Sequence, residues 1–395
     1  MDKMESSISE MIPIRSSESR QSILGPFSLL LSLSGFDLER SIFSNKSSLV
    51  RAWISTGIFI IIFLLFLFRV FSIMGATVDP LSYAWAESNV LGFSSIHALA
   101  SACCLASWTA KGVFTTIFKE LSSIRSQRSP LSLPSSSIQS SSTHIKALIF
   151  SAIFIGICIA TSVQSVIQGR FMPNGTTGST WILSKENLFG IEPLISIWMS
   201  IASTLATTAY VFLHLSVKAE LIQFNDDLKE AKEKKTLADS LKTLATRQSS
   251  LLHLVSILSQ SLSTFASISM FSITLVNINA IFIMSSLRSD MSILAQIVGT
   301  LWVFASVGLL LFTLNPPASI QELINTAGAI VINNEGVIQD TEKMSLASIM
   351  MTRIRVSPTR IALMNAFNIH AATPHIVMLI FPNVAILLSI ARRFI

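Results

Sequence analysis

The chain has 395 residues, of which 51% are hydrophobic and only 13% are charged, and its mean hydropathy is +0.63. Because soluble globular chains carry roughly 25% charged residues, this composition nearly excludes a soluble enzyme and indicates an integral membrane protein. The formal net charge of +6 does not indicate a nucleic-acid partner, because Lys and Arg occur in blocks between apolar runs.

The N-terminal segment is polar and rich in serine, and it precedes the first apolar run. It has no early apolar core, so it does not resemble a cleavable signal peptide. Residues 1–51 are therefore expected to be a cytoplasmic segment. The run that follows is too long and too internal for a signal peptide and is expected to remain as a helix.

Seven segments meet the requirement of about 20 apolar residues for a helix that crosses the hydrocarbon core of a bilayer. They are residues 52–74, 89–110, 147–167, 193–217, 260–285, 293–314 and 373–390. The sequence thus predicts an all-α fold, a seven-transmembrane helical bundle. Its first six helices lie within 52–314, a cytoplasmic extension occupies 218–259, further cytoplasmic helices occupy 315–372, and 373–395 holds the last span.

Lys and Arg are distributed unevenly between the two sides that these spans would define. The N-terminal segment and the second, fourth and sixth loops hold 22 of the 28 basic residues. Because short cytoplasmic loops retain Lys and Arg, the N-terminus is predicted to be cytoplasmic and the C-terminus extracellular. The third loop, on the predicted outer side, carries the sequon Asn174-Gly175-Thr176. Asn174 is a candidate glycosylation site, although such triplets also arise by chance.

Two of the predicted cytoplasmic loops have distinct patterns. The second loop contains a serine-rich tract at 122–142, which is expected to be disordered and open to phosphorylation. In the fourth loop, apolar residues recur in alternating steps of four and three, which predicts a helix from Thr236 into the fifth span. The apolar stripe formed by these residues either packs within one subunit or anchors neighbouring subunits to one another. Its candidate anchor residues are Leu237, Leu241, Leu244, Gln248, Leu251 and Val255.

No motif of catalysis or cofactor binding is found in the chain. There is no zinc-type His/Glu spacing, no glycine-rich phosphate loop and no nucleophile elbow, and the three cysteines lie in apolar runs. The predicted spans also lack Asp, Glu and Lys, which pumps and transporters use. We therefore expect neither an enzyme nor a cofactor, and a transporter-like or accessory membrane protein is a third-ranked alternative.

The chain resembles the insect gustatory and odorant receptor superfamily and its gustatory-receptor-like relatives in nematodes and other animals. The resemblance rests on three features. The first is a seven-helix topology with a cytoplasmic N-terminus and an extracellular C-terminus, and the second is the amphipathic stretch 247–258 that leads into the fifth helix. The third is Asn315-Pro316-Pro317, followed by a cytoplasmic helix, the stretch 360–367 and a last helix. The family's last-helix motif, Thr-Tyr, five apolar residues and Gln-Phe, matches only in its apolar middle at 376–380, which suggests a divergent member.

The resemblance implies a tetramer, homomeric or formed with a related subunit, in which cytoplasmic helices join the subunits and the last helix lines a central cation pore. The implied pore candidates are His375, Val377, Leu379, Ile380 and Val384. It also implies a small-molecule pocket among helices two to six in the outer half of the membrane. Side chains of suitable depth and chemistry are Phe93, His97, Gln164, Trp198, Asn277, Asn279, Gln296 and Trp302, although hydrogen bonding between helices would explain the Asn and Gln residues equally well.

The leading hypothesis is accordingly a chemosensory, ligand-gated, non-selective cation channel of the plasma membrane. Its expected partners are a small-molecule ligand, cations and the lipid bilayer, with no nucleic acid. The alternative is a serpentine G-protein-coupled chemoreceptor, which would have its N-terminus outside the cell.

Overall fold

The computed structural model describes residues 21, 23–38, 46–74, 79–126, 145–161, 191–288, 291–332, 337, 340–356, 362–363, 367–368 and 372–394. This part of the chain is almost entirely helical. Its elements are α2 (Phe27–Leu33), α3 (Lys46–Met74), α4 (Tyr83–Ala110), α5 (Val113–Ser126), the helix Ile145–Thr161, α7 (Ile191–Glu233), α8 (Leu237–Ser286), α9 (Ile293–Ile332), α11 (Thr341–Val356), the two-residue strands β1 (Ala362–Leu363) and β2 (Phe367–Asn368), and α12 (Thr373–Arg392). The two strands pair in antiparallel fashion.

Among the described residues, six helices are long and apolar enough to cross a membrane: Trp53–Ile73, Tyr83–Ala110, Pro193–Glu233, Leu237–Ser286, Ile293–Val331 and Thr373–Arg392. Each contains or closely matches one of the predicted spans. The remaining predicted span, 147–167, begins within the helix Ile145–Thr161, and its residues 162–167 lie outside the described residues. The chain is therefore a multi-pass membrane protein.

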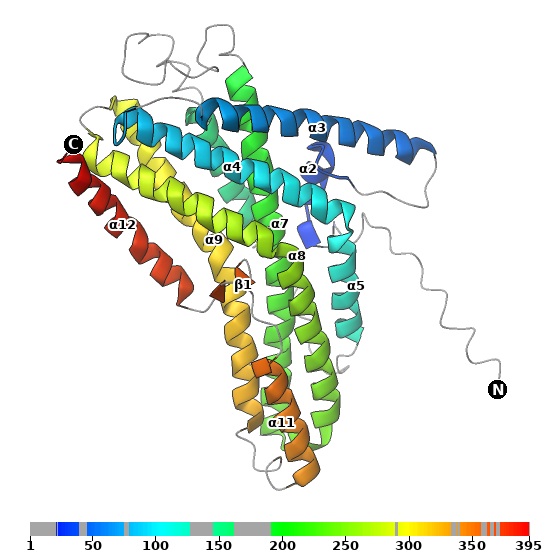
Figure 1. Ribbon diagram of the computed structural model, residues 1–395. Helices are drawn as coiled ribbons and strands as arrows, with labels where there is room; N and C mark the ends of the chain where they lie inside the picture. The colour runs from blue at the N-terminus through cyan, green and yellow to red at the C-terminus, as the bar shows by residue number, and fades with distance from the viewer. Residues whose placement is uncertain are drawn as a thin grey trace.

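Three helices are much longer than a bilayer requires and connect two groups of helices. Figure 1 shows α7, α8 and α9 running from an upper group that includes α3, α4 and α12 into a lower group completed by α11. The predicted helix from Thr236 into the fifth span is confirmed, because α8 continues unbroken for 50 residues. Likewise α9 passes through Pro316 and Pro317 and ends at Ile332.

A single residue in the left-handed conformation forms the turn between α7 and α8. Lys235 has a φ of 57°, and the N–H of Thr236 donates to the carbonyl of Ala231 at 2.9 Å. Such a bond around a left-handed residue satisfies the last carbonyls of a helix. The chain can therefore reverse at once, and α8 packs back along α7.

Two short helices were not predicted from the sequence. In α2, Phe27 and Leu31 are buried, and the Phe27 ring meets the Phe212 ring of α7 at 5.9 Å. The helix α5 buries five apolar side chains and ends only at Ser126. The prediction of disorder is therefore wrong for residues 122–126, because tertiary contacts of α5 with α8 and α7 stabilise a helix whose last turn is rich in serine.

Candidate ligand-binding site

A cavity lies inside the upper group of helices, between α4, the helix Ile145–Thr161, α7, α8 and α9, with one residue from α3. The space between atoms in it, including its open part, is about 640 Å³, which is an upper limit on what a ligand could fill. Pockets for small molecules are mostly apolar and carry a few placed polar groups, as this cavity does. The cavity is lined by Arg69, Leu91, Ser94, His97, Ala98, Phe154, Cys158, Thr161, Ser196, Met199, Ser200, Ser203, Ile273, Val276, Trp302, Ser306 and Leu309.

One part of the wall is polar because α7 presents a serine-rich face. Ser196, Ser200 and Ser203 recur in steps of four and three, so they lie on one side of the helix. The hydroxyl of Ser200 donates to the carbonyl of Ile197 at 2.8 Å, and that of Ser94 on α4 donates to the carbonyl of Val90 at 2.6 Å. A hydroxyl that donates to its own helix still offers acceptor lone pairs, so this wall can accept hydrogen bonds from a ligand.

A buried guanidinium adds positive charge to the same wall. The side chain of Arg69, which comes from α3, donates through Nη1 to Ser196 Oγ at 2.8 Å and approaches Met199 Sδ at 3.2 Å. The residue is only 4% exposed. A charged side chain at this depth is costly unless it is hydrogen-bonded, and such residues mark functional sites by default in membrane proteins.

His97 of α4 offers the cavity a further polar atom. Its Nδ1 lies 3.2 Å from Ser269 Oγ of α8. Its Nε2 is buried and has no hydrogen-bond partner among the residues that the structure describes. Because a buried polar atom normally finds a partner, this nitrogen is suited to meet a hydroxyl or carbonyl group of a ligand.

Another part of the wall is apolar and aromatic. The Trp302 ring of α9 meets the Phe154 ring edge-on at 6.1 Å, and Trp302 Nε1 donates to Thr161 Oγ1 at 2.6 Å. Ile273, Val276 and Leu309 complete this side. The arrangement can hold a compact apolar or aromatic molecule that carries one or two hydrogen-bonding groups.

The predicted pocket residues are placed in different ways. His97 and Trp302 line the cavity, and Gln164 lies outside the described residues. Asn277 lies directly behind the wall, where its Nδ2 donates to Ser306 Oγ at 2.9 Å. The other four predicted residues are not among the lining residues. The ring of Phe93 meets that of Phe271, and Trp198 packs against the core. Asn279 accepts a hydrogen bond from Asn89, and Gln296 accepts one from Arg288.

Sequence reasoning missed most of the polar lining. The serine-rich face of α7 could have been predicted from the helical spacing of Ser196, Ser200 and Ser203 within a predicted span. Arg69 could have been found as the one charged residue within the first predicted span.

The predicted pore residues fall on two faces of α12. Val377 belongs to the face that packs against α8 and α9, together with Pro374, Phe381 and Ala385. Leu379 is 66% exposed and Ile380 is 45% exposed, and His375 is exposed as well, whereas Val384 is half-buried. One helix side is thus covered within the chain, and the other is open to lipid or to another subunit.

All six predicted anchor residues of α8, from Leu237 to Val255, are buried within this one chain. The helices α5, α7, α9 and α11 all pack against α8. The contact of the six residues with a neighbouring subunit stays a prediction. Asn174, the predicted glycosylation site, lies outside the described residues.

Within the described ranges, no group of three His, Cys, Asp or Glu side chains could hold a metal ion.

Comparisons with known proteins agree with this architecture. The protein family described as Caenorhabditis protein of unknown function, DUF267, matches residues 23–385. No curated protein matches the sequence. The solved structure of the insect olfactory receptor OR5 from Machilis hrabei in complex with eugenol is similar to this chain, with a TM-score of 0.68 and 12% identity over 94% of this chain and 98% of that one. A second structure of the same receptor has a TM-score of 0.63 and 12% identity, covering 91% and 95% of the two chains. At this identity the likeness shows a shared fold.

Proposed function

Because the chain belongs to the Caenorhabditis family of unknown function, DUF267, and has the fold of an insect olfactory receptor, we propose that it is a chemosensory receptor. It acts as a ligand-gated, non-selective cation channel of the plasma membrane, and it opens when a small molecule occupies the cavity. Its activity is binding and conduction, without catalysis and without a cofactor.

The observation that carries this proposal is the cavity itself. Its wall combines an aromatic side at Trp302 and Phe154 with a polar side at His97, Arg69 and the serines of α7. The insect receptor of the same fold was solved in complex with eugenol, a small aromatic molecule with a hydroxyl group. A ligand of comparable chemistry would place its ring beside Trp302 and its polar group near His97 Nε2.

The open face of α12 supports the proposed pore. In the proposed tetramer, formed by this chain alone or with a related subunit, Leu379 and Ile380 of each subunit face a central axis. An apolar constriction of this kind closes by loss of water from the pore. Subunits join through the lower group of helices, and the basic loops keep that group and the N-terminus in the cytoplasm.

The cavity is tested by recording ligand-evoked currents from cells that express the chain, using a panel of small aromatic and aliphatic odorants and tastants. Ser94, half-buried in the wall, is changed to Phe to fill the cavity, and Thr300→Phe on the exposed side of α9 is the matched control. We expect Ser94→Phe to abolish the response and Thr300→Phe to preserve it. A response that survives Ser94→Phe would remove the cavity from the proposal.

The pore is tested by comparing the two faces of α12. We expect Leu379→Ala to raise the leak current, because it shortens a side chain on the open face. Val377→Ala should instead lower the amount of folded protein, because Val377 packs against the bundle. No change in leak across variants of the open face would contradict the assignment of α12 to the pore.

The orientation and assembly are tested on intact cells and on purified protein. Tags on both ends, probed with antibodies, should show a hidden N-terminus and an exposed C-terminus, and the purified particle should have fourfold symmetry. An exposed N-terminus with a hidden C-terminus would favour the alternative, a G-protein-coupled chemoreceptor.

A further inference from the structure

A second hollow, separate from the cavity, runs along the outer side of the contact between α7 and α9. The space between atoms in it, including its open part, is about 1090 Å³. It is lined by Val211, Leu215 and Lys218 of α7 and by Gly308, Leu311, Phe312, Asn315, Pro316, Ala318, Ser319 and Glu322 of α9. We call it the α7/α9 groove.

The groove changes from apolar to polar along its length. Val211, Gly308, Leu311 and Phe312 line one end, and polar or charged side chains line the other. From Gly308 to Glu322 the helix α9 rises by about 21 Å, at about 1.5 Å per residue. Half of a hydrocarbon core is about 15 Å thick, so the groove has the length of a lipid headgroup together with much of an acyl chain.

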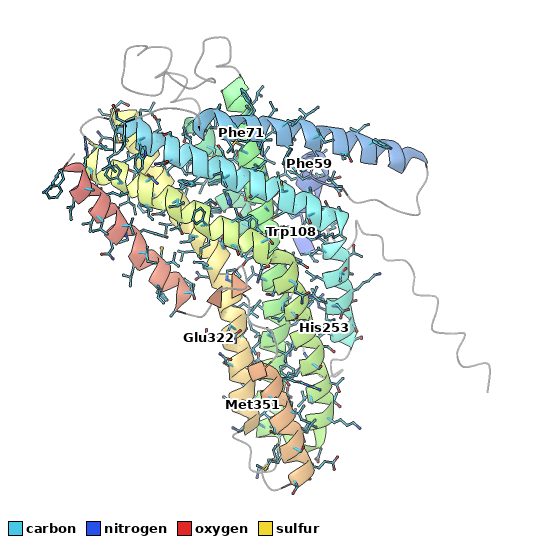
Figure 2. All side chains as sticks on the ribbon, in the orientation of Figure 1. Phe59, Phe71, Trp108, His253, Glu322 and Met351 are labelled. Atoms are coloured by element: carbon cyan, nitrogen blue, oxygen red, sulfur yellow. The ribbon has the colours of Figure 1, made fainter. Side chains whose placement is uncertain are left out.

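The polar end lies where the long helices leave the apolar region. Glu322 is exposed and lies where α9 passes from the upper group of helices towards the lower one (Figure 2). The hydroxyl of Ser319 donates to the carbonyls of Asn315 and Pro316 at 3.0 and 2.9 Å, so its lone pairs remain available as acceptors. This end of the groove therefore matches the headgroup level of a bilayer.

The apolar end is shaped by an aromatic contact. The Phe312 and Phe150 rings lie 4.7 Å apart. A Cβ atom on Gly308 would come within 3.0 Å of Phe150 Cε2. The missing side chain at Gly308 therefore lets Phe150 of the helix Ile145–Thr161 pack close to α9 at this end of the groove.

We propose that the α7/α9 groove binds one phospholipid with a zwitterionic headgroup. Lys218 pairs with the phosphate, Glu322 faces the amine, and an acyl chain lies along Leu215, Leu311 and Phe312. The two charges of opposite sign argue for a zwitterion, because an anionic lipid would place its net charge beside the Glu322 carboxylate. The site depends only on the chain lying in a bilayer, and it stands or falls separately from conduction.

The test counts the phospholipids that stay bound to the purified full-length chain. The protein is reconstituted in a mixture of phosphatidylethanolamine, phosphatidylcholine and phosphatidylglycerol, transferred to detergent, and analysed by native mass spectrometry. We expect one zwitterionic lipid per chain. Ser319→Trp, which fills the groove, should reduce its retention at least tenfold, and Lys218→Gln should reduce it several-fold. Lys111→Gln is the matched control, because Lys111 is an exposed cation at the end of α4 that does not line the groove.

A charge variant tests which lipid is recognised. Glu322→Gln should shift retention towards phosphatidylglycerol, because it removes the negative charge that disfavours an anionic head. If Ser319→Trp fails to fold, Lys218→Gln and Glu322→Gln decide the question. Equal retention by the Lys218, Glu322 and Lys111 variants would overturn the proposal, and so would selective retention of phosphatidylglycerol by the unaltered chain or no retained lipid at all.

Discussion

The indole nitrogen of Trp302 donates a 2.6 Å hydrogen bond to the hydroxyl of Thr161, which joins α9 to the helix Ile145–Thr161 at the wall of the cavity. The bond fixes the rotation of an aromatic ring that is 8% exposed and sets the shape of the apolar side of the site. Four residues of the cavity wall come from α7 and four from α4, and this bond ties the shortest wall helix to α9.

Trp302→Phe tests the contribution of that bond. The substitution removes the donor and replaces the indole by a smaller ring, so we expect a loss of about 1 kcal/mol of stability for the hydrogen bond, a further loss for the cavity that is left, and weaker ligand binding. Thermal unfolding in a fixed detergent measures the first effect. Trp53→Phe is the control, because Trp53 is 71% exposed on α3. Equal shifts in the two variants would mean that the bond contributes nothing.

The buried ion pair between Arg247 and Asp227 should contribute far more to stability than the exposed ion pair between Lys234 and Glu230. Arg247 and Asp227 have side chains 4% and 16% exposed, whereas those of Lys234 and Glu230 are 62% and 56% exposed. The Arg247 guanidinium also lies over the Phe224 ring, 5.6 Å from its centroid. Removing one partner leaves a buried charge, so Asp227→Ala should cost about 3–5 kcal/mol.

Glu230→Ala provides the matched comparison on the same helix and should change stability by less than about 1 kcal/mol. Both variants are measured by thermal unfolding of the purified chain. A similar small loss in both would indicate that water reaches Arg247 and solvates it.

Alanine substitutions at Gly35 and Gly112 separate the effect of backbone conformation on stability from the effect of packing. Both have positive φ, 80° and 63°, which costs a residue with a side chain about 1–2 kcal/mol. At Gly35 an added Cβ would also lie 2.5 Å from Ile58 Cγ2, whereas at Gly112 it would meet no atom within 4 Å. Gly35→Ala should therefore cost about 2–5 kcal/mol and Gly112→Ala about 1–2 kcal/mol. Unfolding temperatures that rank the two variants the other way would contradict the contact of Gly35 with α3.

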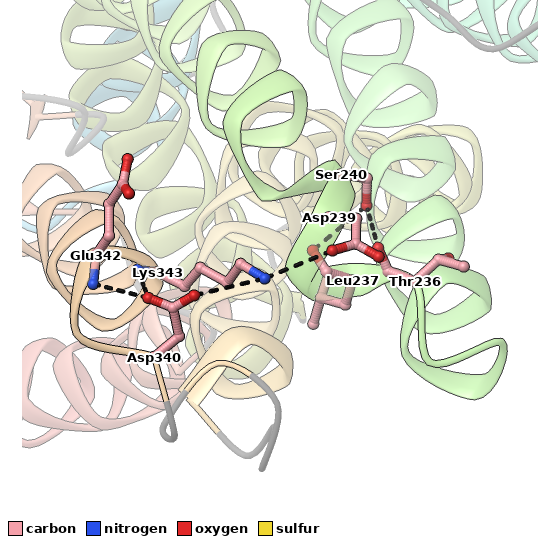
Figure 3. Close-up of polar contacts among 7 residues, drawn as sticks. All are labelled: Thr236, Leu237, Asp239, Ser240, Asp340, Glu342 and Lys343. Atoms are coloured by element: carbon pink, nitrogen blue, oxygen red, sulfur yellow. Dashed lines mark hydrogen bonds and ion pairs between the residues drawn. The ribbon is translucent and has the colours of Figure 1, made fainter.

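The start of α11 should respond to pH through Asp340. Its Oδ1 accepts from the N–H groups of Glu342 and Lys343 at 3.0 and 3.4 Å, and Lys343 Nζ bridges Asp340 and Asp239 of α8 (Figure 3). The hydrogen bond from the backbone of Lys343 is the main cause that lowers the pKa of Asp340 below its usual value. A carboxyl whose pKa is lower in the folded state stabilises the fold above its unfolded pKa and loses this effect as the pH falls through the folded value.

The backbone amides in the first turn of α11 should therefore lose protection from exchange, measured relative to their intrinsic exchange rate at each pH, below about pH 4. Asp340→Asn is the control, because Asn also caps helices but does not titrate. An acid-induced change of the same size in both proteins would assign it to another group.

Much of the fold could be predicted from the sequence, because each prediction concerned one segment and its solvent. The helix that begins near Thr236 follows from the repeat of Leu237, Leu241 and Leu244, and its long continuation into the membrane is present in α8. The helix α2 was missed because its apolar face is short and its partner, Phe212, is distant in the sequence.

The candidate site could be predicted only in part. His97 and Trp302 stood out by chemistry and depth, and both line the cavity. Asn277 was expected in the pocket, but it bonds to Ser306 behind the wall, because the rotation of α8 relative to α9 decides which way its amide points. A sequence pattern does not contain that rotation.

By itself, the sequence determined that the chain lies in a membrane, where its long apolar helices run, and which loops carry positive charge, because hydropathy and charge act on each segment through water and lipid. The tertiary structure alone decided that Arg69 meets Ser196, that Val377 faces the bundle while Leu379 faces outward, and that Lys218 and Glu322 share a groove. Those relationships depend on how helices pair and rotate, which is set by the packing of many side chains at once.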